Sequence, residues 1–201
     1  MIEALDTYDK QLLLWLNGFH NSFWDSIMWW VSSAPFWIPF YLILLYLIIQ
    51  KKKADRVTTL KQFTLIVGSI ALAILLADQI SSGFFKPFFE RLRPSHSPDL
   101  LGQVHLLTDP NGSIYKGGLY GFVSSHAANS FAIAWFVSSL LKSKKMWIFM
   151  IFWAALVSYS RIYLGVHYPG DILGGTVIGI ISGCIASSVY FYFEKKWVLQ
   201  D

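Results

Sequence analysis

Long stretches without a charged side chain constrain this chain more than any other feature. Five such stretches lie between charged residues, and they contain 25, 16, 25, 15 and 22 residues. A helix needs about 20 mostly apolar residues to cross the hydrocarbon core of a bilayer. We therefore predict five membrane-spanning helices, at residues 29–50, 62–85, 122–142, 146–165 and 172–193.

The composition supports a membrane protein. Hydrophobic residues make up 55% of the 201 residues and charged residues only 14%, whereas soluble domains contain about 25% charged residues. The apolar content also excludes a disordered chain. The single cysteine, Cys184, excludes an intrachain disulfide. We expect one all-α domain over residues 1–201, an integral membrane helical bundle.

Lysine and arginine predict how the bundle lies in the membrane, because cytoplasmic loops carry an excess of both. With five spans, one side receives three basic groups: Lys51 to Lys61, Lys142 to Lys145, and Lys195 with Lys196. That side is predicted to be cytoplasmic, together with the C-terminus. The opposite side then holds a second basic set that needs another explanation: Lys86, Arg91, Arg93, Lys116 and Arg161.

Two segments outside the spans complete the outline. Residues 1–28 mix apolar and charged side chains and are predicted to form an amphipathic helix in the outer interface of the membrane. Residues 94–121 form a long stretch rich in Gly, Pro, Asp, Asn and Ser. Loops of this length in a compact domain are usually functional or disordered. We expect residues 94–121 to form an extracytoplasmic loop that covers a functional site.

A first cluster on the predicted outer side runs from Lys86 to Pro94. Lys86 and Arg93 are seven residues apart, so a helix that continues to Pro94 presents both on one face. Two cations on one face suit an anion with several oxygens. The competing interpretation is a pair of boundary residues that reach toward lipid headgroups. Glu90 and Arg91, between them, are expected to be solvated.

A second cluster opens the third predicted span with Val123, Ser124, Ser125 and His126. Small hydroxyl residues cap helix N-termini, and the free N–H groups of such an end form an anion site. His126 then falls in the first turn and faces that site. A histidine that only caps or packs is the alternative.

A third cluster joins the fourth and fifth spans. Arg161 precedes His167 by six residues, and Asp171 follows His167 by four, across Pro169 and Gly170. This spacing lets the carboxylate accept from one imidazole nitrogen and leaves the other free as nucleophile or base. An ion pair that only tethers a loop is the alternative.

Together the clusters suit phosphoryl chemistry. Lys86, Arg93 and Arg161 can hold a phosphoryl group and offset the charge on its oxygens. One histidine can attack phosphorus while the other protonates the leaving oxygen. No cofactor is expected, and no metal is required, because the sequence contains no carboxylate cluster of the kind that binds one.

The three motifs in order, Lys-x6-Arg-Pro, Ser-x-His and Ser-Arg-x5-His-x3-Asp, resemble the signature of the type 2 phosphatidic acid phosphatase superfamily, and they run from Lys86 to Asp171. The resemblance implies a phosphohistidine at His167, oriented by Asp171. It implies that His126 acts as general acid and then as base. The phosphate-binding residues that it implies are Lys86, Arg93, Arg161, Ser124 and Ser125. Val123 and Ser125 replace the Pro and Gly that are usual in the second motif.

The expected activity is hydrolysis of a lipid phosphomonoester or pyrophosphate at the outer face of a bacterial cytoplasmic (inner) membrane. Candidate substrates are undecaprenyl pyrophosphate, phosphatidylglycerol phosphate, phosphatidate and the phosphates of lipid A. The expected partners are this lipid and the bilayer, and no nucleic acid. A phosphotransferase with a lipid or sugar acceptor would have the same site. A non-catalytic lipid-binding or scrambling relative would lack one of the site residues, and a channel would need more polar residues along its spans.

Overall fold

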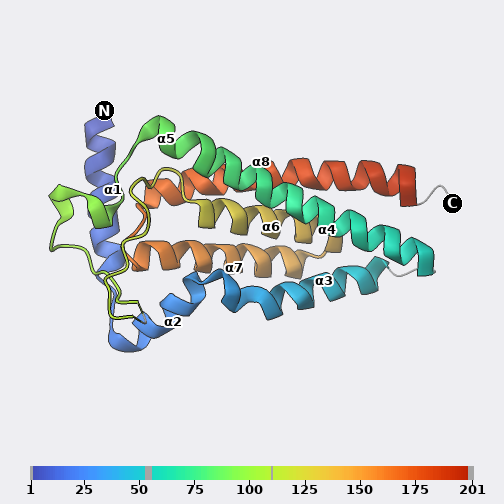
Figure 1. The fold of residues 1–201 in the computed structure, drawn as a ribbon, viewed down its shortest axis with the longest axis horizontal. Helices are drawn as coiled ribbons and strands as arrows, with labels where there is room; N and C mark the ends of the chain where they lie inside the picture. The colour runs from blue at the N-terminus through green and yellow to red at the C-terminus, as the bar shows by residue number, and fades with distance from the viewer. Residues whose placement is uncertain (1, 53–55, 110, 199–201) are drawn as a thin grey trace.

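The computed structural model describes residues 2–52, 56–109 and 111–198. Long helices run side by side along one direction, and another helix crosses one end of them (Figure 1). The predicted all-α fold is confirmed. Within the described ranges, β structure is limited to two isolated bridges, Leu92 with Tyr120 and Thr108 with Ile114. The long helices are α3 (Ile38–Lys52), α4 (Arg56–Asp78), α6 (Ser125–Leu141), α7 (Lys144–Tyr163) and α8 (Pro169–Phe193).

Length and apolarity identify the membrane spans. In the described part of the chain, four helical stretches are long and apolar enough to cross a membrane: Ala34–Lys52, Thr58–Phe89, Lys144–Tyr163 and Pro169–Val198. The remaining long helix, α6, has 17 residues, which is the lower limit for a span. It packs against α4, α7 and α8, and most of its residues are buried. The five charge-free stretches therefore each correspond to one long helix.

Two observed boundaries differ from the predicted spans. The first candidate span begins at Ala34 instead of near residue 29, because α2 (Ser22–Ser32) continues through Trp29 and the chain leaves the helix at Ser33, before Pro35. The second extends past residue 85, because a π-helical segment (Gln79–Phe85) and α5 (Lys86–Phe89) continue α4.

The N-terminal segment contains two helices instead of the single predicted one. α1 (Ile2–Asn17) crosses the end of the bundle, contacts α7 and α8, and is separated from α2 by a turn (Figure 1). The Asn21 side chain caps α2 by accepting from the Trp24 N–H at 3.0 Å, which is typical of a helix N-cap. α1 has two different faces: Leu13 is fully buried, whereas Trp15 is 61% exposed.

The two ends of the bundle separate the predicted basic groups. The end of α3, the start of α4 and the α6–α7 connection lie at the same end as the last turn of α8, while α1, α5 and the loop after α5 lie at the other end (Figure 1). Short 3-10 turns, Pro94–His96 and Pro98–Leu100, interrupt that loop. A π-helical turn, Glu194–Val198, follows α8. The separation predicted from Lys and Arg is thus present, and the assignment of one end to the cytoplasm stays a prediction.

Three glycines bring α8 against α6. A Cβ atom added at Gly175, Gly179 or Gly183 would lie 2.4, 2.4 and 2.7 Å from a backbone carbonyl oxygen of α6 or its N-cap. Small residues at this spacing let two helix backbones approach closely in a membrane. The contact fixes the start of α6 beside the start of α8, where the second and third sequence clusters lie.

We expect Gly179→Ala to destabilise the protein by about 1–3 kcal/mol, because overpacking a tight contact costs that much. Helix propensity alone would favour alanine by about 1 kcal/mol. The matched control is Gly68→Ala in α4, where an added Cβ meets nothing within 4 Å. Thermal unfolding in detergent measures both variants. Equal midpoints for the two would contradict the close contact.

Candidate active site

A buried histidine–aspartate pair lies where α7 gives way to α8. The His167 Nδ1 atom is 3.1 Å from Asp171 Oδ2, and the two side chains are 1% and 0% exposed. The same carboxylate oxygen accepts from the Tyr168 N–H at 3.0 Å. Pro169 begins α8, so Asp171 lies in the first turn of that helix. The predicted pairing across the turn is confirmed, and the Nε2 atom of His167 is left for chemistry.

The N-terminus of α6 lies beside this pair. Ser124 caps the helix, and its hydroxyl accepts from the Ala127 N–H at 3.4 Å. The Ser124 N–H in turn donates to the backbone carbonyl of Asp171 at 3.0 Å. His126, which is half-buried, follows in the first turn. The predicted cap is therefore confirmed, and it is bonded directly to Asp171, the residue that contacts His167.

The two cations of the first cluster reach the site separately. The prediction that one helix face carries Lys86 and Arg93 is wrong, because α5 ends at Phe89 and Glu90 adopts a left-handed conformation with φ of 47°. The chain then reverses, and Leu92 forms a bridge with Tyr120. The helix thus ends before Pro94.

Lys86 is held by hydroxyl groups. Its Nζ donates to Ser125 Oγ at 2.8 Å and to Ser82 Oγ at 3.1 Å. Ser82 also donates to Asp78 Oδ1 at 3.3 Å, one turn earlier in the same helical stretch. Ser125 contributes its hydroxyl to the lysine, so the ammonium group lies at the N-terminus of α6.

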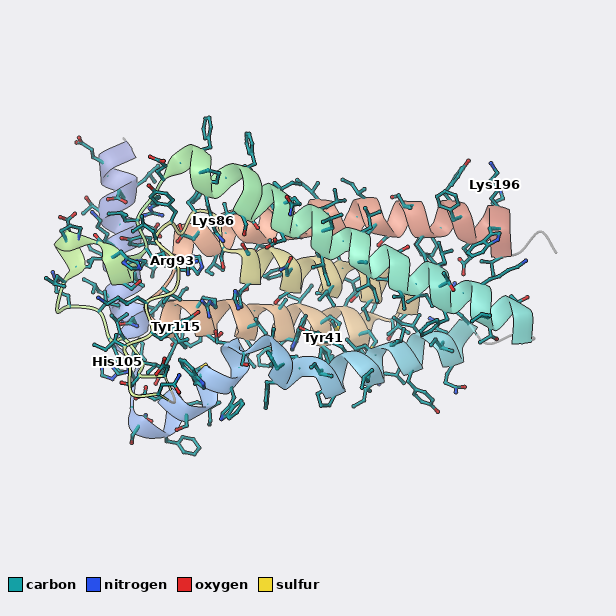
Figure 2. All side chains as sticks on the ribbon, viewed as in Figure 1. Tyr41, Lys86, Arg93, His105, Tyr115 and Lys196 are labelled. Atoms are coloured by element: carbon teal, nitrogen blue, oxygen red, sulfur yellow. The ribbon has the colours of Figure 1, made fainter. Side chains whose placement is uncertain are left out.

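Arg93 is buried, with 7% of its surface exposed. Its Nε donates to the Tyr120 carbonyl at 3.1 Å, and Nη1 lies 3.5 Å from the Val166 carbonyl. Val166 precedes His167, so Arg93 connects the loop to the histidine turn. Figure 2 shows the labelled Lys86, Arg93 and Tyr115 toward the loop end of the molecule, with Lys196 at the opposite end.

Arg161 lines a cavity of about 190 Å³ together with His126. Its guanidinium donates to Ser32 Oγ on α2 and, at 3.1 Å, to the Tyr115 hydroxyl. Its Nε atom is buried and has no hydrogen-bond partner among the described residues. A buried donor without a partner is costly, and an anion in the cavity would satisfy it. A larger cavity of about 640 Å³, between α1 and the start of α8, is lined mainly by apolar residues and by none of the predicted site residues.

The charges around His167 keep it neutral. Burial lowers its pKa well below the usual value, and the positive charges of Arg93, Arg161 and Lys86 lower it further. An imidazole must be neutral to act as a nucleophile. The site therefore combines a neutral histidine with three cations, an arrangement suited to attack on a phosphoryl group.

Four residues that hold the site together were not predicted from the sequence: Arg91, Asp9, Ser32 and Tyr115. Arg91 is not solvated as expected: its guanidinium lies 3.1 Å from the second oxygen of Asp171 and 2.8 Å from Asp9. Ser32 and Tyr115 hold Arg161. For Arg91, the sequence offered one signal of a role in the site, namely that it belongs to the basic set on the predicted outer side. The others belong to no motif and reach the site from distant segments.

Comparisons with known proteins identify the family and its relatives. The PAP2 superfamily model matches residues 64–195. The chain is 39% identical over 193 residues to the lipid A 4'-phosphatase of Bacteroides thetaiotaomicron, covering 96% of this chain and 79% of that protein. It is 36% identical over 200 residues to the lipid A 4'-phosphatase of Porphyromonas gingivalis, covering 98% and 79%. The crystal structure of Aquifex aeolicus LpxE superposes with a TM-score of 0.59 at 26% identity, covering 89% of this chain and 93% of that one.

Proposed function

This chain belongs to the PAP2 superfamily, and we propose that it hydrolyses a phosphate ester or diphosphate of a membrane lipid through a phosphohistidine at His167. The observation that carries the proposal is the buried pair of His167 and Asp171, 3.1 Å apart, surrounded by three cations. Hydrogen bonding to Asp171 holds the imidazole in the tautomer with a free Nε2.

The reaction takes two steps. In the first, His167 Nε2 forms a bond to phosphorus while the phosphorus–oxygen bond to the lipid breaks. His126 gives a proton to the leaving oxygen. In the second, His126 removes a proton from water, which attacks the phosphohistidine, and the nitrogen–phosphorus bond breaks. Phosphate leaves, and His167 returns to its neutral form.

The cations stabilise the negative charge of the transferring group. Arg161 offers its unpartnered Nε toward the anion. Lys86 supplies a point charge held by Ser125, and Ser124 positions the α6 N-terminus, whose N–H groups attract phosphate oxygens. With this positive charge supplied by side chains, we expect the reaction to proceed without a metal ion.

The identity of the relatives favours a phosphate on a lipid A type glycolipid as the substrate. The two lipid A 4'-phosphatases align with nearly the whole chain. We propose that the site faces the extracytoplasmic side of a bacterial cytoplasmic membrane, with loop 94–121 over it, residues 1–28 at the interface and the C-terminus in the cytoplasm. The basic groups gathered at the C-terminal end of the bundle support this orientation.

The test is phosphate release by the purified protein in detergent with EDTA present. The panel contains bisphosphorylated lipid A, undecaprenyl diphosphate, phosphatidylglycerol phosphate and phosphatidate. We expect release that persists in EDTA and is fastest from lipid A. Loss of release in EDTA would contradict the metal-independent mechanism. No release from any lipid by folded protein would contradict hydrolysis and direct the search to an alcohol acceptor.

A further inference from the structure

We propose that Arg91 is a positioning residue for the catalytic pair and that α1 holds Arg91 in place, so that the N-terminal helix belongs to the catalytic unit. The proposal rests on the proposed function, because Arg91 acts on the reaction only through Asp171 and His167. Arg91 stands between these residues and two carboxylates of α1.

Both oxygens of Asp171 are committed. Oδ2 faces His167 Nδ1 and the Tyr168 N–H, while Oδ1 accepts from Arg91 Nη1 at 3.1 Å. The carboxylate is fully buried. A buried ionised carboxylate is strongly unfavourable unless it is paired and hydrogen-bonded. Arg91 is the cation in direct contact with it, so Arg91 both neutralises the charge and sets the plane of the carboxylate.

The guanidinium of Arg91 is itself fixed on three sides. Its Nη2 lies 2.9 Å from Asp6 Oδ1 and 2.8 Å from Asp9 Oδ2. Its Cζ atom stands 3.9 Å from the centroid of the Tyr168 ring, within the range of a cation–π contact. A planar group with several fixed donors transmits orientation well. The direction in which Nη1 points at Asp171 is therefore decided by α1 and Tyr168.

α1 also touches the catalytic turn directly. Asp9 Oδ1 accepts from the Gly170 N–H at 2.8 Å, one residue before Asp171. The Asp9 side chain is only 14% exposed. Through its two oxygens Asp9 thus joins α1 both to the start of α8 and to Arg91. One residue of the N-terminal helix supports the catalytic carboxylate by two routes.

The charges support the same arrangement. Burial lowers the pKa of Arg91, but Asp171, Asp9 and Asp6 raise it by more, so the net shift is upward. For the Asp9 carboxyl, burial raises the pKa, and its hydrogen bonds from the Gly170 N–H and from Arg91 oppose that rise. Arg91 therefore stays charged, and its removal would leave the buried Asp171 and the partly buried Asp9 without their shared cation.

The experiment measures kcat and KM for phosphate release by wild type, Arg91→Gln, Arg91→Lys, Asp9→Asn and the double variant Arg91→Gln/Asp9→Asn. We expect Arg91→Gln to lower kcat by about 10- to 100-fold, as loss of an outer hydrogen-bond partner does elsewhere, with KM nearly unchanged. Arg91→Lys should recover part of kcat. Asp9→Asn should lower kcat by less, because the amide oxygen can still accept from the Gly170 N–H. The double variant should then be no slower than Arg91→Gln alone, because both changes break the same contact between α1 and Arg91.

The matched control is Glu90→Gln, which removes the charge of an exposed neighbour and should leave kcat unchanged. Thermal unfolding of each variant separates lost activity from lost fold. A folded Arg91→Gln with wild-type kcat would overturn the proposal, as would a double variant whose loss is the product of the two single losses. Measuring His167→Ala as well separates the proposed function from the role of Arg91. If wild type is active and His167→Ala is not, hydrolysis through His167 stands even where the Arg91 variants show no effect.

Discussion

His167→Ala is expected to reduce phosphate release by about 10⁴-fold or more, the scale of loss when a covalent nucleophile is removed. No other group among the described residues takes the position of the His167 Nε2 atom. The second ring nitrogen, Nδ1, lies 3.1 Å from the buried carboxylate of Asp171. The measurement is initial-rate phosphate release from lipid A in detergent. His20→Ala is the control, because His20 is exposed and stacks on His105 at the same end of the molecule.

The covalent intermediate can be trapped in the same experiment. An activated aryl phosphate needs no proton on its leaving oxygen, so His126→Ala should still undergo the first step with such a substrate. It should then hydrolyse slowly, because the base for water is missing. Labelled phosphate should accumulate on the His126→Ala protein as an acid-labile, base-stable adduct. The adduct should be absent from the double variant His126→Ala/His167→Ala. A His167→Ala variant that retains a tenth of wild-type activity would contradict the assigned nucleophile.

Asp171→Asn is expected to lower kcat by about 10³- to 10⁴-fold while the fold survives, by analogy with the loss when a catalytic triad carboxylate becomes an amide. The amide has nearly the same shape and can still accept from the Tyr168 N–H. It carries no charge, so it neither stabilises the developing positive charge on His167 nor pairs with Arg91, 3.1 Å away.

Asp99→Asn provides the comparison, since Asp99 is a carboxylate on the loop with a side chain 69% exposed and paired with Lys10. The two variants are compared by kcat, KM and thermal unfolding midpoint. We expect a kcat loss confined to Asp171→Asn with little change in KM. Activity of Asp171→Asn within tenfold of wild type would show that the carboxylate does not orient His167.

Sequence patterns predicted well wherever the deciding interaction is local. Asp171 follows His167 by four residues across a proline, and that spacing was enough to predict their pairing. The cap at Ser124 followed from residue type alone. The prediction for Lys86 and Arg93 was wrong for the complementary reason: Glu90 ends the helix in a left-handed conformation, and the bridge between Leu92 and Tyr120, 28 positions apart, redirects the chain.

The sequence by itself determined that this chain is a helical membrane protein and that its charged residues divide between two ends. It also predicted the residues of one candidate phosphoryl-transfer site, as three motifs in order. Charge-free length and helical spacing could be read in this way because they depend on neighbouring residues alone. Only the tertiary structure decided how Asp9, Arg91 and Asp171 connect, and how Ser32 and Tyr115 hold Arg161. Those contacts join segments 46 to 129 residues apart, and they exist because α2 packs on α7 and α1 lies across the end of the bundle against α7 and α8.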